Sequence, residues 1–147
     1  MDPFSDLVAR LSRMGMVKSL GMRVEQDQTG LIAVLPFHND LIGNFTIQAL
    51  HGGAIGTFLE LTAMAEVILK TEGGVQPKTI NLTIDYLRQG RAKDLHARAY
   101  ITKLGRRIAS VRAEAWQDNK NEPVAALTAH FLIGTEEAAD EGRTADP

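Results

Sequence analysis

One carboxylate, Glu60, stands in a run of small and apolar residues where a charge has no evident partner. If the segment is helical, the residues that share its face are Gly56, Thr57, Ala63 and Met64. A carboxylate on a mostly apolar face must be paired, desolvated or used in a reaction. The plainer alternative is that Glu60 only reaches a rim of the fold or a neighbouring backbone donor. Residue type alone leaves both interpretations open.

The tripeptide His51-Gly52-Gly53 stands where the helical pattern around Glu60 begins. The first N–H groups of a helix lack partners within the helix and carry positive dipole character. Two glycines let a ligand approach such donors closely. An oxyanion donor and a carboxylate in one concavity are what acyl transfer requires. Otherwise, the glycines only make a tight helix entry and His51 is a structural histidine.

The element that must position these groups is a helix over residues 52–70. Its apolar residues cover more than one face, so we expect the helix to be largely buried. Glu66 and Lys70 form its expected polar strip, and Glu60 lies about 120° away from that strip. Gly73-Gly74 and then Pro77 are expected to end it.

Four extended segments follow the helix, each alternating apolar and polar residues at a period of two. Short turns between them predict antiparallel neighbours, because parallel pairing needs a long crossover. With a hairpin predicted over residues 21–36, this gives an α+β fold in which about six antiparallel strands wrap around a long central helix. The turns are at residues 89–91, 104–106 and 118–121. Residues 4–11 predict a short amphipathic helix with Gly15 near its end, and residues 37–50 predict a loop.

Composition indicates one domain, over residues 1–134, followed by a disordered acidic tail over residues 135–147. A net charge of −2 gives no sign of a nucleic-acid or anionic-membrane partner. The absence of cysteine excludes disulfides, a thiolate nucleophile and thiolate metal ligands. The N-terminal residues do not resemble a secretory signal, and the apolar stretch is too interrupted for a membrane span. A cytoplasmic protein is therefore the default expectation.

The chain resembles the PaaI-like acyl-CoA thioesterases of the hotdog superfamily from about residue 21 to residue 134. The resemblance rests on HGGAIGTFLELTAMAE, TINLTIDYLRQGR and LGRRIASVRAEAW, which fit the strands and helix of that family in order and spacing. It implies a hotdog fold, hydrolysis of an acyl- or aryl-CoA, and a homo-oligomer, either a dimer or a dimer of dimers (a homotetramer). Its active sites would lie at the dimer interface and combine residues from two chains.

The resemblance also implies a role for each site residue. Gly52, with or without Gly53, would donate to the thioester carbonyl, and His51 would shape the turn. Glu60 would act as general base or as nucleophile. Thr79 would help to hold the water. Where many members carry a loop Asn or Gln this chain has Phe45, so the loop polar residue would be Asn44 or Gln48.

No metal or other cofactor is expected beyond the coenzyme A of the substrate. The phosphates of coenzyme A favour basic partners, which two neighbouring turns offer, although such charges are often only solvated. These candidates are Arg88, Arg91, Lys103, Arg106 and Arg107. Two alternatives remain: a hotdog hydratase or dehydratase acting on an acyl carrier, and a non-catalytic acyl-CoA-binding hotdog protein.

Overall fold

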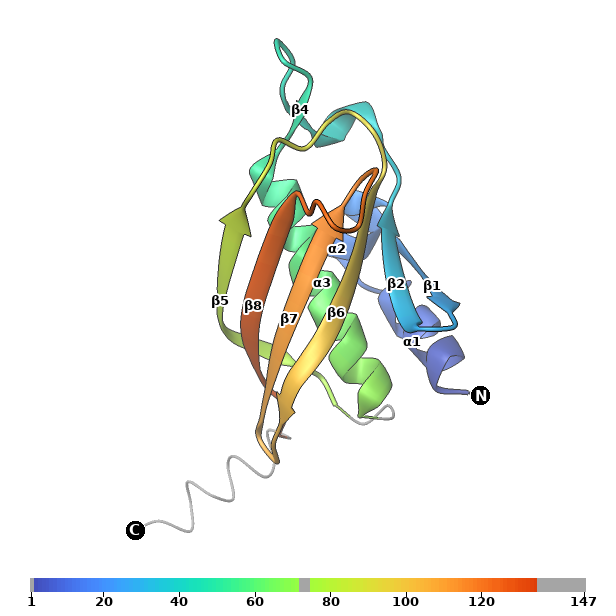
Figure 1. Cartoon of the computed structure of the whole chain (residues 1–147). Helices are drawn as coiled ribbons and strands as arrows, with labels where there is room; N and C mark the ends of the chain where they lie inside the picture. The colour runs from blue at the N-terminus through green and yellow to red at the C-terminus, as the bar shows by residue number, and fades with distance from the viewer. Residues whose placement is uncertain (1, 72–74, 135–147) are drawn as a thin grey trace.

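A six-stranded antiparallel sheet and one long helix make up most of the computed structural model, which describes residues 2–71 and 75–134 (Figure 1). The strands lie in the order β1-β2-β6-β7-β8-β5. This arrangement confirms the predicted α+β hotdog fold. The strands of the sheet are β1 (Arg23–Asp27), β2 (Gly30–Leu35), β5 (Lys78–Tyr86), β6 (Leu95–Leu104), β7 (Ile108–Trp116) and β8 (Ala125–Leu132).

The long helix α3 (Gly52–Lys70) has the predicted bounds and packs on a floor of small side chains. Its large residues, Phe58 and Leu59 among them, are fully buried against the inner face of the sheet. Small floor residues let the helix backbone approach the sheet closely, as dense packing requires. Seven alanines, each at most 5% exposed, form this floor: Ala97, Ala99, Ala109, Ala113, Ala115, Ala125 and Ala129.

The N-terminal region differs from the prediction by one helix. Helix α1 (Pro3–Leu11) is capped by Asp2 and buries Leu7 and Leu11 in the core. Gly15 does not lie near its end but begins a second short helix, α2 (Gly15–Leu20). Six residues give too weak a periodic signal to identify a helix from sequence.

The segment predicted as a loop over residues 37–50 contains short regular elements. A 3-10 turn η1 (Asn39–Leu41) leads into a small hairpin of β3 (Ile42–Asn44) and β4 (Ala49–Leu50). This hairpin projects beyond the sheet beside the first turn of α3 (Figure 1). Strands of two and three residues are too short to show an alternating pattern.

One predicted strand pairing is wrong. Strand β5 does not neighbour β6 but lies at the edge of the sheet and pairs with β8. Residues 87–94 cross the end of the sheet, where the Gly90 carbonyl accepts the Leu50 N–H at 2.9 Å. This connection is long enough to pass over two strands, so the turn signal at residues 89–91 did not imply adjacency.

The prediction of a polar strip on α3 is also wrong in part. Glu66 is only 7% exposed, whereas Lys70 reaches solvent, and Glu60 is half-buried. Helix α3 ends at Lys70. The predicted stop at Gly73-Gly74 and the predicted tail over residues 135–147 lie outside the described residues.

Candidate active site

The first turn of α3 has an unusual N-cap. His51 is the N-cap residue, and its Nδ1 accepts the Gly53 N–H at 2.9 Å. The role normally belongs to Ser, Thr, Asp or Asn. Because Nδ1 is the acceptor, a neutral His51 carries its proton on Nε2. A methyl group added at Gly53 would lie 2.9 Å from Cε1 of His51, so this cap requires glycine there.

Tyr86, at the end of β5, fixes the same turn from its other side. Its hydroxyl donates to the Gly52 carbonyl at 2.7 Å. The Gly52-Gly53 peptide is therefore held at both its carbonyl and its N–H. The Gly52 N–H belongs to the preceding peptide and has no acceptor within the described part of the chain. Of the two glycines proposed as oxyanion donors, Gly52 is thus the one whose N–H is free.

Glu60 lies two turns further along α3 and is held by a strand hydroxyl. Thr79 Oγ1 donates to Glu60 Oε2 at 2.6 Å. This contact depends on an irregularity in β5, because the register with β8 shifts between Thr79 and Asn81. The shift turns Thr79 toward α3 and leaves Ile80 51% exposed, although simple alternation would give the reverse.

The two halves of the candidate site are well separated within one chain. Glu60 follows Gly52 by eight residues, which is about 12 Å along a helix axis. A reacting carbonyl must lie about 3 Å from both its donor and its attacking group. One chain therefore positions each half but does not bring the two together around one thioester.

Sequence comparison decides the family. A sequence model of the thioesterase superfamily matches residues 48–124, which include both the Gly52 turn and Glu60. The chain belongs to the thioesterase superfamily. The predicted assignment to a thioester hydrolase family is thereby confirmed.

Relatives of this superfamily member cover most of its length. A protein of Escherichia coli K12 named medium/long-chain acyl-CoA thioesterase YigI is 28% identical over 132 residues, which cover 80% of this chain and 84% of the relative. A solved structure from Chromobacterium violaceum is 38% identical, covers 92% of this chain and 99% of its own, and has a TM-score of 0.72. A phenylacetic acid degradation-related protein of Ralstonia eutropha JMP134 shares the fold at 24% identity, with coverage of 90% and 100% and a TM-score of 0.76.

In this member of the superfamily, the two loop candidates shape the β3-β4 hairpin. Asn44 Oδ1 accepts the Thr46 N–H at 3.0 Å, and Gln48 Nε2 donates to the Phe45 carbonyl at 2.8 Å. Both side chains are exposed, and Gln48 has a positive φ of 53°. Neither contacts Glu60 in the same chain, so their part in the reaction stays a prediction.

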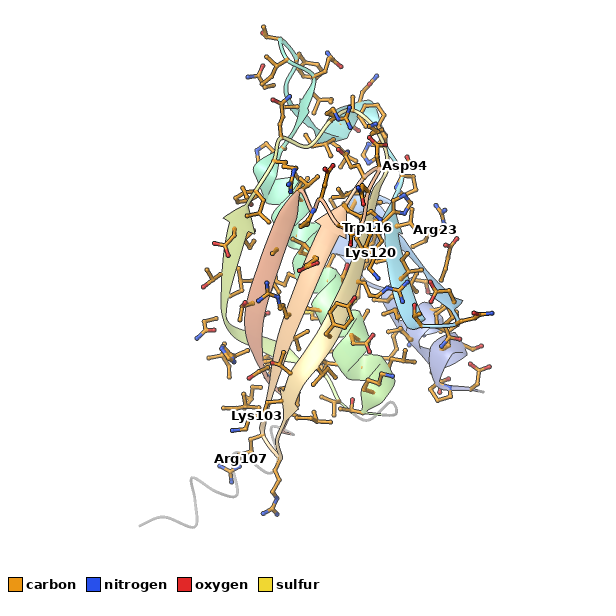
Figure 2. All side chains as sticks on the ribbon, in the orientation of Figure 1. Arg23, Asp94, Lys103, Arg107, Trp116 and Lys120 are labelled. Carbon is orange, nitrogen blue, oxygen red and sulfur yellow. The ribbon has the colours of Figure 1, made fainter. Side chains whose placement is uncertain are left out.

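The basic residues predicted to bind coenzyme A do not form one cluster. Arg88 and Arg91 lie near the Gly52 end of the sheet, whereas Lys103, Arg106 and Arg107 lie at the opposite end. Figure 2 shows Lys103 and Arg107 far from Asp94, which stands at the other end of β6. The expectation that they occupy neighbouring turns is wrong, because successive connections meet a strand at its two ends, about 30 Å apart here.

The cations near the Gly52 end are already partly paired. Arg88 donates to the Pro123 carbonyl at 2.9 Å, and Asp118 binds both Arg91 and Lys93. The bond from Lys93, followed by the charges of both cations, lowers the pKa of Asp118. These contacts leave less positive charge free for a phosphate than the sequence indicates.

Two further features bear on the site. Within residues 2–71 and 75–134, no three His, Cys, Asp or Glu side chains gather as a metal site would require. Helix α3 is long and apolar enough to cross a membrane, but 61% of its apolar window is buried within this fold. It is the core helix of the domain.

Sequence reasoning missed Tyr86 as a site residue. It stands in the same phase of β5 as Leu82 and Ile84, which face α3. A tyrosine at the end of an inward-facing row brings a donor to whatever polar backbone lies there. The position of Tyr86 at the end of this row is the feature of the sequence that could have identified it as a site residue.

Proposed function

We propose that this protein hydrolyses acyl-CoA thioesters, with Glu60 as the attacking or water-activating carboxylate and the Gly52 N–H as the oxyanion donor. The observation that carries the proposal is that one helix has two such groups. The Gly52 N–H at its N-terminus has no acceptor among the described residues, and its half-buried carboxylate, Glu60, is held by Thr79. The relatives named medium/long-chain acyl-CoA thioesterases support acyl-CoA as the substrate class and indicate the chain lengths to test first.

The chemistry follows from these groups. The thioester carbonyl oxygen accepts the Gly52 N–H, which stabilises the charge that develops in the tetrahedral intermediate. In one route Glu60 removes a proton from the attacking water and passes it to the departing thiolate, so that coenzyme A leaves as the thiol and the acyl group as the free acid. In the other route Glu60 attacks the carbonyl, expels coenzyme A and forms a mixed anhydride, which water then hydrolyses to the free acid and the Glu60 carboxylate. Both routes need the Glu60 anion, which the Thr79 hydroxyl orients and stabilises by hydrogen bonding.

A complete site in this proposal needs two chains. Because Gly52 and Glu60 are about 12 Å apart along α3, we propose that Glu60 works with Gly52 of the partner subunit. A two-fold axis beside β5 makes this possible. Tyr86 marks the Gly52 end of β5 and Thr79 marks the Glu60 end, so an antiparallel β5 pair brings the Gly52 end of one chain toward the Glu60 end of the other.

The edge of β5 supports this pairing. β5 bonds to β8 on one side, and no described strand of the chain covers its other side. A nine-residue edge strand is a template for pairing with another chain. The exposed apolar residues in β5 and directly after it are Ile80, Tyr86 and Leu87, each between 51% and 54% exposed.

The test uses two inactive variants that fail for different reasons. Glu60→Gln removes the carboxylate, and Gly52→Pro removes the N–H. Proline suits the first helical position, and His51 already has the extended backbone, φ −66° and ψ 128°, that precedes a proline. Each variant alone should lose about 100-fold or more in kcat, the scale of losing a base or an oxyanion donor.

Mixed dimers then decide whether the site is shared. Co-expressed Glu60→Gln and Gly52→Pro chains should recover about a quarter of wild-type activity, because half the dimers are mixed and each has one intact site. No recovery, with mixed dimers present, would place the site within one chain. Gly52→Ala is the matched control: it keeps the N–H, and its methyl group would lie an ordinary 3.5 Å from the Tyr86 ring.

The substrate is tested by thiol release from acyl-CoAs of short, medium and long chain and from an aryl-CoA. Turnover that depends on Glu60 supports the hydrolase. Binding of acyl-CoA without thiol release would instead support the non-catalytic alternative, and hydration of an enoyl thioester would support the hydratase.

A further inference from the structure

A cavity lies on the side of α3 away from Glu60, where β2 and β6 separate. These strands pair only at Ala33–Ala97, Val34–His96 and Leu35–Leu95, and then diverge toward the β1-β2 turn (Figure 1). The opening between them has a volume of about 520 Å³, within the ~300–1,000 Å³ typical of small-molecule pockets. Two residues of α3, Glu66 and Lys70, contribute to its lining.

One wall of this β2-β6 cavity is fixed by Arg98. This guanidinium, in a residue only 7% exposed, reaches from β6 to the β1-β2 turn, where Nη2 binds Asp27 Oδ2 at 2.6 Å and Nη1 binds the Thr29 hydroxyl. The bond holds the pKa of the Asp27 carboxyl well below its usual range. Arg98 Nε is buried without a partner among the described residues. Both terminal nitrogens of Arg98 are therefore engaged, and the guanidinium lines the cavity without a free pair of donors for an anion.

Glu66 is the carboxylate that lines this cavity, and its oxygens, unlike Arg98 Nε, are not fully covered by the fold. It is 7% exposed, lines the cavity, and makes no hydrogen bond with any described residue. Its nearest cation, the largely exposed Lys70, has its Nζ 3.9 Å from Oε1, which is too far for a hydrogen bond. Burial raises the pKa of Glu66, and the charges of Lys70 and Arg98 oppose that rise. A buried carboxylate of this kind normally has a donor.

We propose that the β2-β6 cavity binds a neutral aliphatic alcohol, whose hydroxyl donates to Glu66 and whose chain packs against the apolar lining. That lining consists of Leu31, Ala99, Ile101 and Leu104. A cationic head group would be repelled by Lys70, whose Nζ already lies 3.9 Å from Glu66 Oε1, and an anionic head group would be repelled by Glu66 itself. A hydroxyl satisfies the carboxylate without either repulsion.

This cavity is separate from the site proposed for hydrolysis. Glu66 follows Glu60 by six residues, which turns it about 120° around the helix. Glu60 faces Thr79 on β5, whereas Glu66 faces β2 and β6, which are separated from β5 by β7 and β8. Loss of hydrolysis therefore does not imply loss of the cavity.

Three probes of equal chain length test the head group: 1-octanol, octylamine and octanoate. They are titrated into the full-length protein, and backbone amide shifts are followed by NMR. We expect 1-octanol to shift the amides of Thr29, Gly30 and Ala99 and to bind about tenfold more tightly than the charged probes, the scale of one hydrogen bond to a charged group. The shifts should persist in Glu60→Gln and in the presence of coenzyme A.

Two variants locate the binding. Glu66→Leu should weaken 1-octanol about tenfold, while Glu114→Leu, which removes a carboxylate on the outer face of β7, should not. Leu104→Trp fills the mouth of the cavity from a residue that is 51% exposed, so it should block binding without disturbing the core. Equal affinity for all three probes, preference for a charged probe, or 1-octanol binding that survives Leu104→Trp would each overturn the proposal.

Discussion

At the scale of single residues, the site depends on hydroxyl groups that hold other groups in place. Thr79 holds the Glu60 carboxylate and Tyr86 holds the Gly52 carbonyl. Neither is a residue whose type alone attracts notice. Both act by fixing the geometry on which an oxyanion site depends.

Tyr86→Phe isolates the second of these contacts. It removes one hydroxyl and keeps the ring that packs near Gly52. We expect kcat to fall several-fold with KM nearly unchanged, because the oxyanion donor is displaced while the binding surfaces remain. Thermal unfolding should show a loss of about 1 kcal/mol, typical of one hydrogen bond. A changed KM with an unchanged kcat would instead make Tyr86 a substrate contact.

Glu66→Gln should stabilise the protein at neutral pH. Burial raises the pKa of Glu66 above its ordinary 4.5, so the folded state binds more protons than the unfolded state as pH rises through and above that value. Wild-type stability therefore falls over that range. Gln does not ionise, so its advantage should be present at pH 7 and shrink toward pH 4.

Denaturant unfolding of both proteins at the two pH values measures this difference. Glu25→Gln, which alters an exposed carboxylate on β1, is the control and should change little. An advantage of Glu66→Gln that is independent of pH would show that ionisation is not its cause.

Residue types and spacing predicted the Glu60 and His51-Gly52-Gly53 features, because a lone carboxylate and paired glycines are conspicuous in an apolar helix. The inward direction of Thr79 could not be derived from period, since the irregularity after it reverses the alternation. Which glycine has the free N–H depends on the His51 cap, a contact between atoms that sequence does not specify.

At the scale of elements, the β3-β4 hairpin is pressed against the entry of α3. A methyl group added at Gly43 would lie 2.8 Å from Cα of His51, a backbone atom that cannot turn aside. Gly43→Ala should therefore lower stability by about 1–3 kcal/mol and reduce kcat, because His51 and the Gly52 turn must shift. Unfolding and steady-state kinetics measure both effects.

Gly15→Ala is the matched control for that experiment, because a methyl group there meets nothing within 4 Å. It should leave stability unchanged or slightly raised. Equal effects of the two substitutions would mean that loss of glycine, and not contact with His51, is responsible.

The sequence predicted the longer helices and strands, but it did not predict which strands are neighbours in the sheet. Helix α3 has 19 residues and the four later strands have eight to ten residues each, which is long enough for their sequence patterns to show. The position of β5 beside β8 depends on where residues 87–94 cross the sheet, and the Leu50–Gly90 bond that fixes this crossing joins segments 40 residues apart. Local patterns carry no information about such a contact.

At the scale of the whole molecule, the proposed dimer predicts that β5 is indispensable for turnover. Ile80→Lys places a charge on its exposed side, and charges on edge strands oppose pairing. Light scattering should then detect particles near the 16.0 kDa of one chain, with turnover lost. Val8→Lys, at an exposed apolar position on α1, should change neither property. An active Ile80→Lys monomer would rule out the shared site.

The alanine floor under α3 also limits how such a protein can diverge. Apart from glycine and serine, the amino acids that one nucleotide change can reach from an alanine codon are larger or charged, or, as with proline, break a strand. At seven fully packed positions most such changes lift the helix or bury a charge, and selection removes them. We therefore expect substitutions to be tolerated first at exposed positions outside this floor, such as residues 45–47 at the tip of the β3-β4 hairpin.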